Sequence, residues 1–152
     1  MRIPFEHFSD QAKVWVYQAD RFLSETEVAW VNEQLEAFIP TWNAHGAKLN
    51  AAFEVISSCF VCLSVEEDEA SASGCSIDSS VRIIKQIEKE LGCSFFNRLK
   101  MLVEEENELK YVPFHTLSDM KNVNVFNNNV QFLKDLRSNW RIPVEKYAEL
   151  AF

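Results

Sequence analysis

Glycine and proline are scarce in this chain, and the loops that bind nucleotides are missing. The sequence has 3 Gly and 4 Pro in 152 residues, which leaves little room for long disordered linkers. Neither Gly-x-x-x-x-Gly-Lys-Ser/Thr nor Gly-x-Gly-x-x-Gly occurs, so no familiar phosphate-cradling loop is present. Gly-x-Ser-x-Gly and His-Glu-x-x-His are absent as well. These absences exclude the easily recognised nucleotide-binding proteins and hydrolases, and we expect no cofactor.

Clustered positive charge and long apolar runs are also lacking. The 15 Lys and Arg are scattered against 23 Asp and Glu, and the formal net charge of −8 repels nucleic acid and anionic lipid. No stretch of about 20 apolar residues is available to span a bilayer, and the N-terminus lacks the apolar core of a signal peptide. We therefore expect a cytoplasmic protein that binds neither nucleic acid nor membrane. Its four cysteines are then free thiols: Cys59, Cys62, Cys75 and Cys93.

What the chain does have is the length and the apolar content of one domain, covering 1–152. It is 47% hydrophobic, and a domain of this size buries roughly 70% of the surface of its unfolded chain. Apolar periodicity and turn residues predict the following elements in order. They are a strand at 14–17, a helix after Ser24 ended by Pro40, a hairpin of 49–56 and 59–65, a helix stopped by Gly92, a hairpin of 99–103 and 109–112 around an acidic turn at 104–108, a short edge strand at 123–126, and a helix capped by Asn127 to Asn129 and ended at Ile142.

This order favours an α+β fold with a mainly antiparallel sheet of about five strands and three helices. The plan is β-α-ββ-α-ββ-α, and one arrangement compatible with it is ferredoxin-like. The first helix has the clearest start, because Ser24 and Glu27 have the capping-box spacing. For the second helix, Ser76 or Asp78 is the expected cap.

The pair Cys59-x-x-Cys62 has the spacing of half a zinc site or of a redox motif. Its surroundings, however, predict a strand, on which residues three apart point to opposite faces. A zinc site needs a turn and two more ligands, and a redox pair needs a helix N-terminus. We therefore expect two buried core cysteines and no metal site.

The segment from Ser73 to Ser80 is the densest in small and polar residues, and it precedes a predicted helix. Free backbone N–H groups at a helix start favour an anion or a thiolate, so Gly74, Ser76, Asp78 and Ser79 are candidate ligand-binding residues. Cys75 is the cysteine at this position, although the negative charge of Asp78 offsets part of the effect on its thiolate. The alternative is a capped helix start that binds nothing.

Aromatic residues are the other candidate for function. Trp30 falls beside the apolar stripe of the first helix, and Trp42 falls in a loop. If these rings are exposed, they mark a protein–protein surface, including a homodimer interface.

Four blocks of the chain together resemble a family of short bacterial proteins that are often automatically labelled as ABC transporter ATPases. The blocks are Trp15-Val16-Tyr17-Gln18-Ala19-Asp20-Arg21, Trp42-Asn43-Ala44-His45-Gly46, the segment Ser73 to Val81, and Asn139-Trp140-x-Ile142-Pro143. The ATPase label is not supported, because the Walker motif and the Leu-Ser-Gly-Gly-Gln signature are both missing. The resemblance implies no mechanism. It does direct attention to turn residues, which are a stronger hint of function than core residues.

Two hypotheses follow. In the first, the chain is a non-catalytic domain that binds a protein partner or a small ligand at the Cys75 turn. If the turns that carry Arg21, His45, Cys75 and Asp78 converge at one end of the sheet, these residues form one polar pocket. In the second, the chain is a thiol-dependent enzyme or redox protein, with Cys75 as nucleophile, His45 as base, and Arg21 or helix N–H groups stabilising negative charge.

Overall fold

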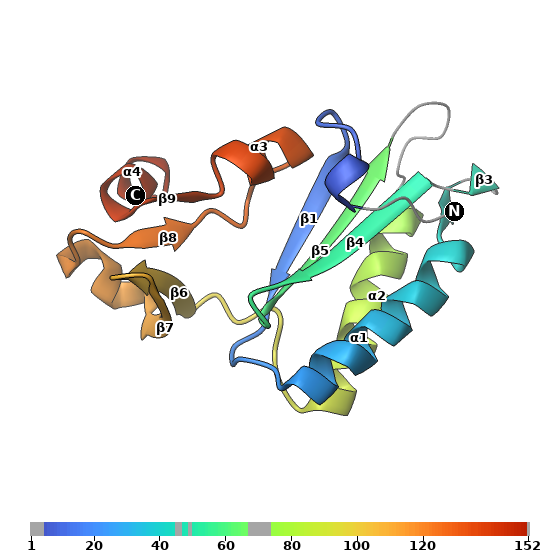
Figure 1. Ribbon diagram of the computed structural model, residues 1–152, viewed down its shortest axis with the longest axis horizontal. Coiled ribbons are helices and arrows are strands. Elements are labelled where there is room, and N and C mark those ends of the chain that lie inside the picture. Colours follow the sequence, from blue (N-terminus) through green and yellow to red (C-terminus); the bar gives the residue numbers. More distant parts are fainter. Residues whose placement is uncertain (1–4, 45–46, 49, 67–73, 152) are drawn as a thin grey trace.

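Two antiparallel sheets organise the chain (Figure 1). The computed structural model describes residues 5–44, 47–48, 50–66 and 74–151, and at 43–44, 47–48, 74–76 and 150–151 it describes the backbone alone. The first sheet has the strand order β1-β5-β4 and the second has β7-β6-β8-β9, while β2 pairs with β3. The strands are β1 (Lys13–Gln18), β2 (Asn43–Ala44), β3 (Ala47–Lys48), β4 (Asn50–Ile56), β5 (Phe60–Glu66), β6 (Lys100–Glu105), β7 (Glu108–Pro113), β8 (Asn124–Phe126) and β9 (Arg141–Pro143).

The α+β class agrees with the sequence, but the strands are divided between the two larger sheets and the separate pair β2–β3 instead of forming one sheet of about five. Neither sheet confirms the ferredoxin-like order. The α-helices are α1 (Glu25–Phe38), α2 (Gly74–Leu91), α3 (Leu133–Ser138) and α4 (Val144–Ala151), and the short 3-10 helices are η1 (Phe5–His7), η2 (Ile39–Thr41) and η3 (Phe114–Asp119). No helix in the described ranges is long and apolar enough to cross a membrane.

Helices α1 and α2 lie side by side on one face of the first sheet (Figure 1). The predicted capping box of α1 is present, since Ser24 accepts from the backbone of Glu27 and Glu27 accepts from the backbone of Ser24. Val31 and Leu35 of this helix are fully buried. The capping chemistry and the apolar stripe therefore fix where α1 begins and which face it buries.

Helix α2 begins at Gly74, so Ser76 and Asp78 lie inside its first turns and the expected cap position is wrong. No proline interrupts the segment from Gly74 to Asp78, and the helix therefore extends further toward the N-terminus than its polar residues indicate. Its predicted end is confirmed, because Gly92 has a φ of 64°, a conformation that glycine adopts without steric cost.

Both predicted hairpins are confirmed, β4 with β5 and β6 with β7. The acidic turn is shorter than expected, since only Glu106 and Asn107 separate the paired residues Glu105 and Glu108. Both turn residues have positive φ, 52° and 66°, as a two-residue type I′ turn requires.

The C-terminal third differs most from the expectation. Strand β8 was expected at an edge, yet it lies between β6 and β9. Helix α3 begins at Leu133 after the N-cap Phe132, so the run Asn127 to Asn129 caps nothing. Ile142 lies in β9 and not at a helix end, and α4 follows it without having been predicted. A three-residue strand is too short to show alternation, and its pairing partner lies elsewhere in the chain.

The two sheets share one hydrophobic core. Phe60 of β5 packs against Phe126 and Trp140, with ring centroids 5.0 and 4.7 Å apart. Leu102 of β6 belongs to the same buried cluster. A second cluster lies between the second sheet and α4, and its buried members are Met101, Val103, Leu117, Val123, Val125, Ile142 and Val144. The second sheet is thus covered on one face by the first sheet and on the other by η3 and α4.

Candidate functional site

The segment that follows β1 connects the two sheets. Ala19 is fully buried, its N–H donates to the carbonyl of Cys59 at 2.7 Å, and its own carbonyl accepts from the Tyr111 hydroxyl at 2.6 Å. Asp20 accepts at its carbonyl from Lys100 Nζ at 2.7 Å, and its carboxylate accepts from the Ser94 N–H at 3.0 Å. Consecutive residues therefore hold the hairpin β4–β5, the hairpin β6–β7 and the loop after α2 in one arrangement.

A chain of side-chain hydrogen bonds crosses the same junction. Trp140 Nε1 donates to Asn128 Oδ1 at 2.9 Å, and Asn128 Nδ2 donates to Gln18 Oε1 at 3.1 Å. Gln18 Nε2 then donates to the carbonyl of Lys100 at 3.2 Å. Three of the residues that carry the family resemblance, Gln18, Ala19 and Trp140, are thus structural connectors between the sheets.

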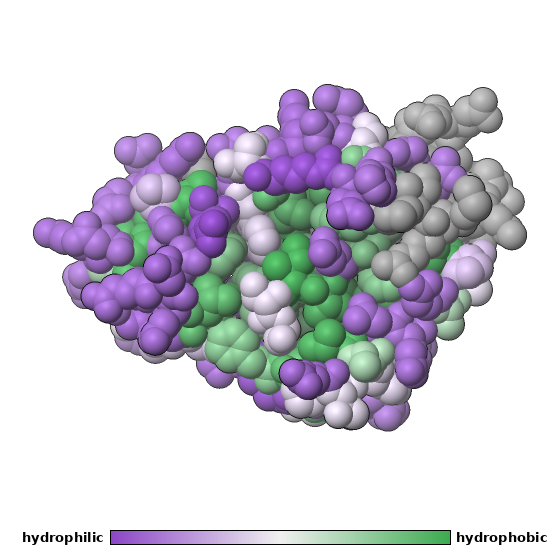
Figure 2. Space-filling model, viewed as in Figure 1, coloured by the Kyte–Doolittle hydropathy of each residue, from purple (hydrophilic) through white to green (hydrophobic). Residues whose placement is uncertain are grey.

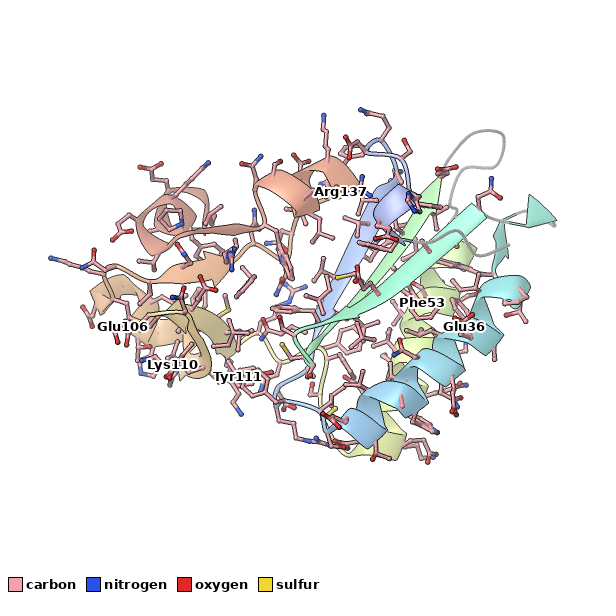
Figure 3. All side chains as sticks on the ribbon, viewed as in Figure 1. Glu36, Phe53, Glu106, Lys110, Tyr111 and Arg137 are labelled. Atoms are coloured by element: carbon pink, nitrogen blue, oxygen red, sulfur yellow. The ribbon has the colours of Figure 1, made fainter. Side chains whose placement is uncertain are left out.

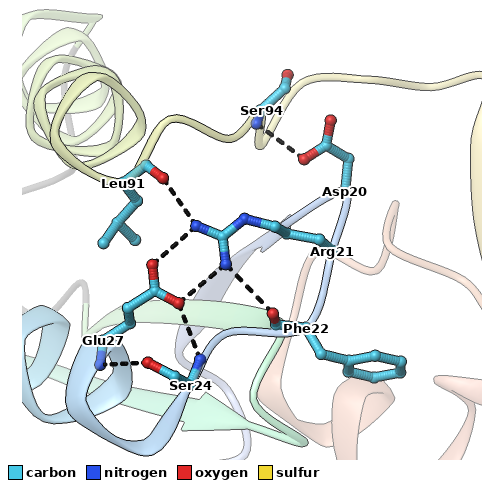
Figure 4. A network of polar contacts seen from close by, with 7 residues as sticks. All are labelled: Asp20, Arg21, Phe22, Ser24, Glu27, Leu91 and Ser94. Carbon is cyan, nitrogen blue, oxygen red and sulfur yellow. Dashed lines mark hydrogen bonds and ion pairs between the residues drawn. The ribbon is translucent and has the colours of Figure 1, made fainter.

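Arg21 ties the start of α1 to the end of α2 (Figure 4). Its two terminal nitrogens donate to the two carboxylate oxygens of Glu27 at 2.9 and 2.8 Å, and one also donates to the Leu91 carbonyl at 2.7 Å. The hydrogen bond from Arg21 is the main reason why the pKa of Glu27 falls from its ordinary value of 4.5 to about 2. Hydrogen bonding to Glu27 likewise raises the pKa of Arg21.

The candidate ligand-binding residues do not meet in one pocket. Gly74, Ser76, Asp78 and Ser79 lie in the first two turns of α2, whereas Arg21 contacts Leu91 at its last residue. Leu91 lies thirteen positions after Asp78 along the helix, which corresponds to roughly 20 Å at 1.5 Å per residue. The guanidinium of Arg21 is moreover occupied by Glu27 and backbone carbonyls. Arg21 and Asp78 therefore do not converge, and the condition for a shared polar pocket is not met by this pair.

The proposed thiol mechanism uses Cys75 and His45. His45 lies outside the described residues, and at Cys75 the backbone alone is described. Of their neighbours, Asp78 is exposed and Ser79 is half-buried. The contact that anchors this end of α2 is made by Ser80, whose hydroxyl is 3.4 Å from the Tyr17 hydroxyl and donates to the Ile77 carbonyl at 2.7 Å.

The three cysteines described with their side chains are free, and two of them are buried. Cys59 and Cys62 are fully buried, which confirms the prediction of core cysteines, although Cys59 lies in the hairpin turn and not on the strand. Burial raises the pKa of Cys59 to about 12 and raises that of Cys62 as well. Burial also raises the pKa of the half-buried Cys93. In the described part of the chain, no three His, Cys, Asp or Glu side chains cluster as metal ligands.

The aromatic residues singled out from the sequence belong mostly to the core. Trp42 is only 1% exposed and packs between Phe38 and Trp15, at centroid distances of 5.2 and 6.1 Å. Trp30 is half-buried against the same cluster. Trp42 is buried and Trp30 is half-buried, so the condition for a protein–protein surface at these two rings is not met. Hydrophobic side chains do reach the surface in the middle of the face drawn in Figure 2, where the two sheets meet, and hydrophilic residues surround them.

The large hydrophobic residues that are exposed lie instead beside the junction of the sheets. Leu99 is 76% exposed, and Phe22 and Phe96 are each 42% exposed. Phe22 packs on Tyr111 with a centroid distance of 5.1 Å. An open pocket of about 320 Å³ adjoins them, and its lining is Asn97, Leu99, Lys100, Tyr111, Val112 and Pro113. We call Phe22, Leu99, Tyr111 and Pro113, with this pocket, the Leu99 surface.

Sequence reasoning missed the Leu99 surface because its residues come from three separate segments. Leu99 was taken as the first residue of a strand, but β6 begins one residue later, at Lys100. The available signal was the apolar content of the loop 93–99, in which Phe95, Phe96 and Leu99 follow the helix stop at Gly92. A loop of that composition buries some of its apolar side chains and exposes others, and Phe95 is the buried one here.

No family model, curated protein or solved structure matches the chain. The resemblance to the bacterial family therefore stays a prediction, and the case for function rests on the contacts of the described residues.

Proposed function

We propose that this chain is a non-catalytic cytoplasmic domain that binds another polypeptide through the Leu99 surface. The observation that carries the proposal is the 76% exposure of Leu99 beside a pocket of about 320 Å³. Exposed apolar side chains that line a concavity are the usual mark of a binding site, whereas singly scattered ones are not. Free thiols at Cys59, Cys62 and Cys93 support a reducing compartment.

The walls of the pocket are held in place before any partner arrives. Tyr111 is anchored by its hydroxyl to the buried Ala19, and Lys100 is anchored by its ammonium to the Asp20 carbonyl. The Lys100 ammonium also lies 5.0 Å from the centroid of the Tyr111 ring. A preformed pocket loses less conformational entropy on binding than a mobile one, and this favours binding as its use.

The thiol-dependent alternative receives no support from the described residues. Cys59, Cys62 and Cys93 all have raised pKa values, the opposite of what a nucleophilic thiolate needs. The alternative therefore depends wholly on Cys75 and His45. No described contact favours a charge-stabilising role for Arg21 beside them, because its guanidinium is bound to Glu27.

The proposal is tested by selection from a phage-displayed library of random 12-residue peptides. Peptides enriched on the wild-type protein are expected to shift the backbone NMR signals of Asn97, Leu99 and Val112. The Leu99→Ser variant is expected to lose at least about tenfold in affinity for them, since central apolar contacts dominate such interfaces. Asp78→Ala is the control at the first turns of α2, and it is expected to bind normally.

Two results would overturn the proposal. The first is a library that yields no peptide dependent on the folded protein. The second is a reversed pattern, in which Asp78→Ala weakens binding and Leu99→Ser does not, because the site then lies at the start of α2.

A further inference from the structure

Strand β7 is an edge of the second sheet, and in the described part of the chain no strand pairs with its outer side. The two-residue turn makes Glu105 and Glu108 a hydrogen-bonded pair. Because hydrogen-bonded pairs alternate along an antiparallel ladder, Glu108, Lys110 and Val112 direct their backbone groups to β6. Leu109 and Tyr111 then direct their N–H and C=O groups outward, available to a further strand.

The two ends of this edge differ in chemistry. At one end, Tyr111, Val112 and Pro113 line the apolar pocket together with Leu99. At the other end lies the acidic turn. Figure 3 shows Glu106 and Lys110 toward the far end of the hairpin and Tyr111 toward the first sheet. An extended segment lying along β7 therefore contacts an apolar site at one end and a charged site at the other.

The acidic end carries two carboxylates that no cation neutralises in the described part of the chain. Glu104 is paired with Arg141 at 2.7 Å and Glu105 with Lys110 at 2.9 Å. Glu106 and Glu108 are exposed and form no such ion pair with any described residue. The whole chain carries a formal charge of −8, which repels a second copy of itself and attracts a basic partner.

We propose that β7 binds an extended basic peptide segment as an additional antiparallel strand. An apolar residue of this segment occupies the pocket of the Leu99 surface, and Lys or Arg residues lie beside Glu106 and Glu108. The proposal rests on the proposed function and specifies its partner. A strand of six residues such as β7 spans roughly 20 Å, so about six partner residues match it. In the antiparallel direction the apolar residue precedes the basic ones. Pro113 has no N–H and ends the pairing.

The probe is the synthetic peptide acetyl-Leu-Thr-Val-Thr-Lys-Lys-amide. It is titrated into the ¹⁵N-labelled full chain, with amide hydrogen exchange measured in parallel. The Leu109 and Tyr111 amides are expected to exchange at least about tenfold more slowly when the peptide is bound, because both become ladder donors. The same peptide with both Lys replaced by Glu is expected to bind at least about fivefold more weakly.

Protein variants separate the acidic turn from the overall charge. The double variant Glu106→Lys with Glu108→Lys is expected to weaken binding about fivefold. The matched control is Glu33→Lys with Glu90→Lys, two exposed positions on α1 and α2 that change the net charge equally. It is expected to change the affinity less than about twofold at 0.15 M salt, where charges beyond about 8 Å are screened. Equal losses in the two double variants would contradict a specific role for the turn.

The outcomes distinguish this inference from the proposed function. If peptides from the random library shift Leu99 while the Leu109 and Tyr111 amides exchange as before, the Leu99 surface binds polypeptides but strand addition is wrong. The same conclusion follows if library peptides bind and the synthetic probe does not. If neither binds, both proposals fail. Sedimentation velocity shows whether the chain forms a dimer. If it does, and if hydrogen exchange shows that the Leu109 and Tyr111 amides are protected in the dimer, the occupant of β7 is a second copy and the basic-peptide proposal is wrong.

Discussion

The middle strand of the first sheet, β5, and an outer strand of the second sheet, β7, differ in how far their residues are buried. In β5 every residue from Phe60 to Val65 is buried, because α1 and α2 cover one face and the second sheet with α3 covers the other. In β7 no residue is fully buried, and one side of its backbone faces outward. A strand enclosed on both faces contributes to stability, whereas an edge beside a preformed pocket contributes little stability and is free to bind.

The largest expected effect is on the alkylation rates of the thiols, which report how well β5 is enclosed. Cys62 on β5 and Cys59 in its turn are expected to react with iodoacetamide far more slowly than Cys93. A rise of the Cys59 pKa from 9.0 to about 12 lowers its thiolate fraction about a thousandfold at pH 8. Mass spectrometry of the native protein measures the rate at each cysteine. Rates at Cys59 and Cys62 equal to those of the unfolded chain would show that β5 is not enclosed.

The same measurement tests the thiol mechanism. Fast, selective alkylation of Cys75 with an apparent pKa well below the ~8.5 of a free thiol would revive it and make His45→Ala the next variant. An ordinary rate at Cys75 removes the nucleophile.

Phe60→Ala is expected to have the largest effect on stability. The substitution removes a fully buried ring that packs on Phe126 and Trp140, and it leaves a cavity between the sheets. We expect a loss of about 3 to 5 kcal/mol in the free energy of unfolding, measured by urea denaturation. The comparison on β7 is the half-buried Val112, whose change to Ala is expected to cost about 1 kcal/mol. Equal losses in the free energy of unfolding for Phe60→Ala and Val112→Ala would show that β5 and β7 do not differ in their contribution to stability.

Asn128→Ala tests the junction between the sheets. The change leaves Trp140 Nε1 and Gln18 Oε1 without their partner, and we expect a loss of about 1 to 2 kcal/mol. Trp140→Phe removes the same indole N–H donor while keeping an aromatic ring. If the hydrogen-bond chain acts as a unit, the double variant loses less than the sum of the two single losses. Strict additivity would show that the chain contributes nothing beyond its separate bonds.

Glu27→Gln is expected to alter the pH dependence of stability. The pKa of Glu27 is lowered from 4.5 to about 2 in the folded protein, so its ionised form stabilises the fold above pH 4.5. That contribution is lost as the pH falls from about 4.5 to about 2, because the carboxylate becomes protonated. Urea midpoints of the wild type and Glu27→Gln should therefore differ at pH 7 and converge by pH 2. A constant difference would show that the charge of Glu27 is not what Arg21 stabilises.

Leu99→Ser is expected to have the smallest effect on stability. A side chain that is 76% exposed contributes little to folding, so the free energy of unfolding should change by less than about 0.5 kcal/mol. The variant should nonetheless lose peptide binding. A destabilisation of 2 kcal/mol or more would show that Leu99 supports the fold and that its exposure has no functional meaning.

The elements whose signals are local could be predicted from the amino-acid sequence alone. The capping box of Ser24 and Glu27 lies within four residues, and the start of α1 was predicted from it. Gly92 stops α2 because the left-handed conformation there is readily available only to glycine. The two hairpins pair residues that are close in sequence, so alternation and turn residues were enough to predict them. The burial of Cys59 and Cys62 followed from the apolar run around them.

Contacts between residues far apart in the sequence could not be predicted and are seen in the folded structure alone. Arg21 has the positive charge that an anion-binding residue needs, but its partners are Glu27 and the carbonyl of Leu91, 70 positions away. Gln18 bonds to Lys100 and Asn128, at separations of 82 and 110 positions. The order β7-β6-β8-β9, and with it the open edge of β7, depends on the pairing of two three-residue strands. Such contacts are selected by the free energy of burying the whole core, and no local pattern in the sequence records them.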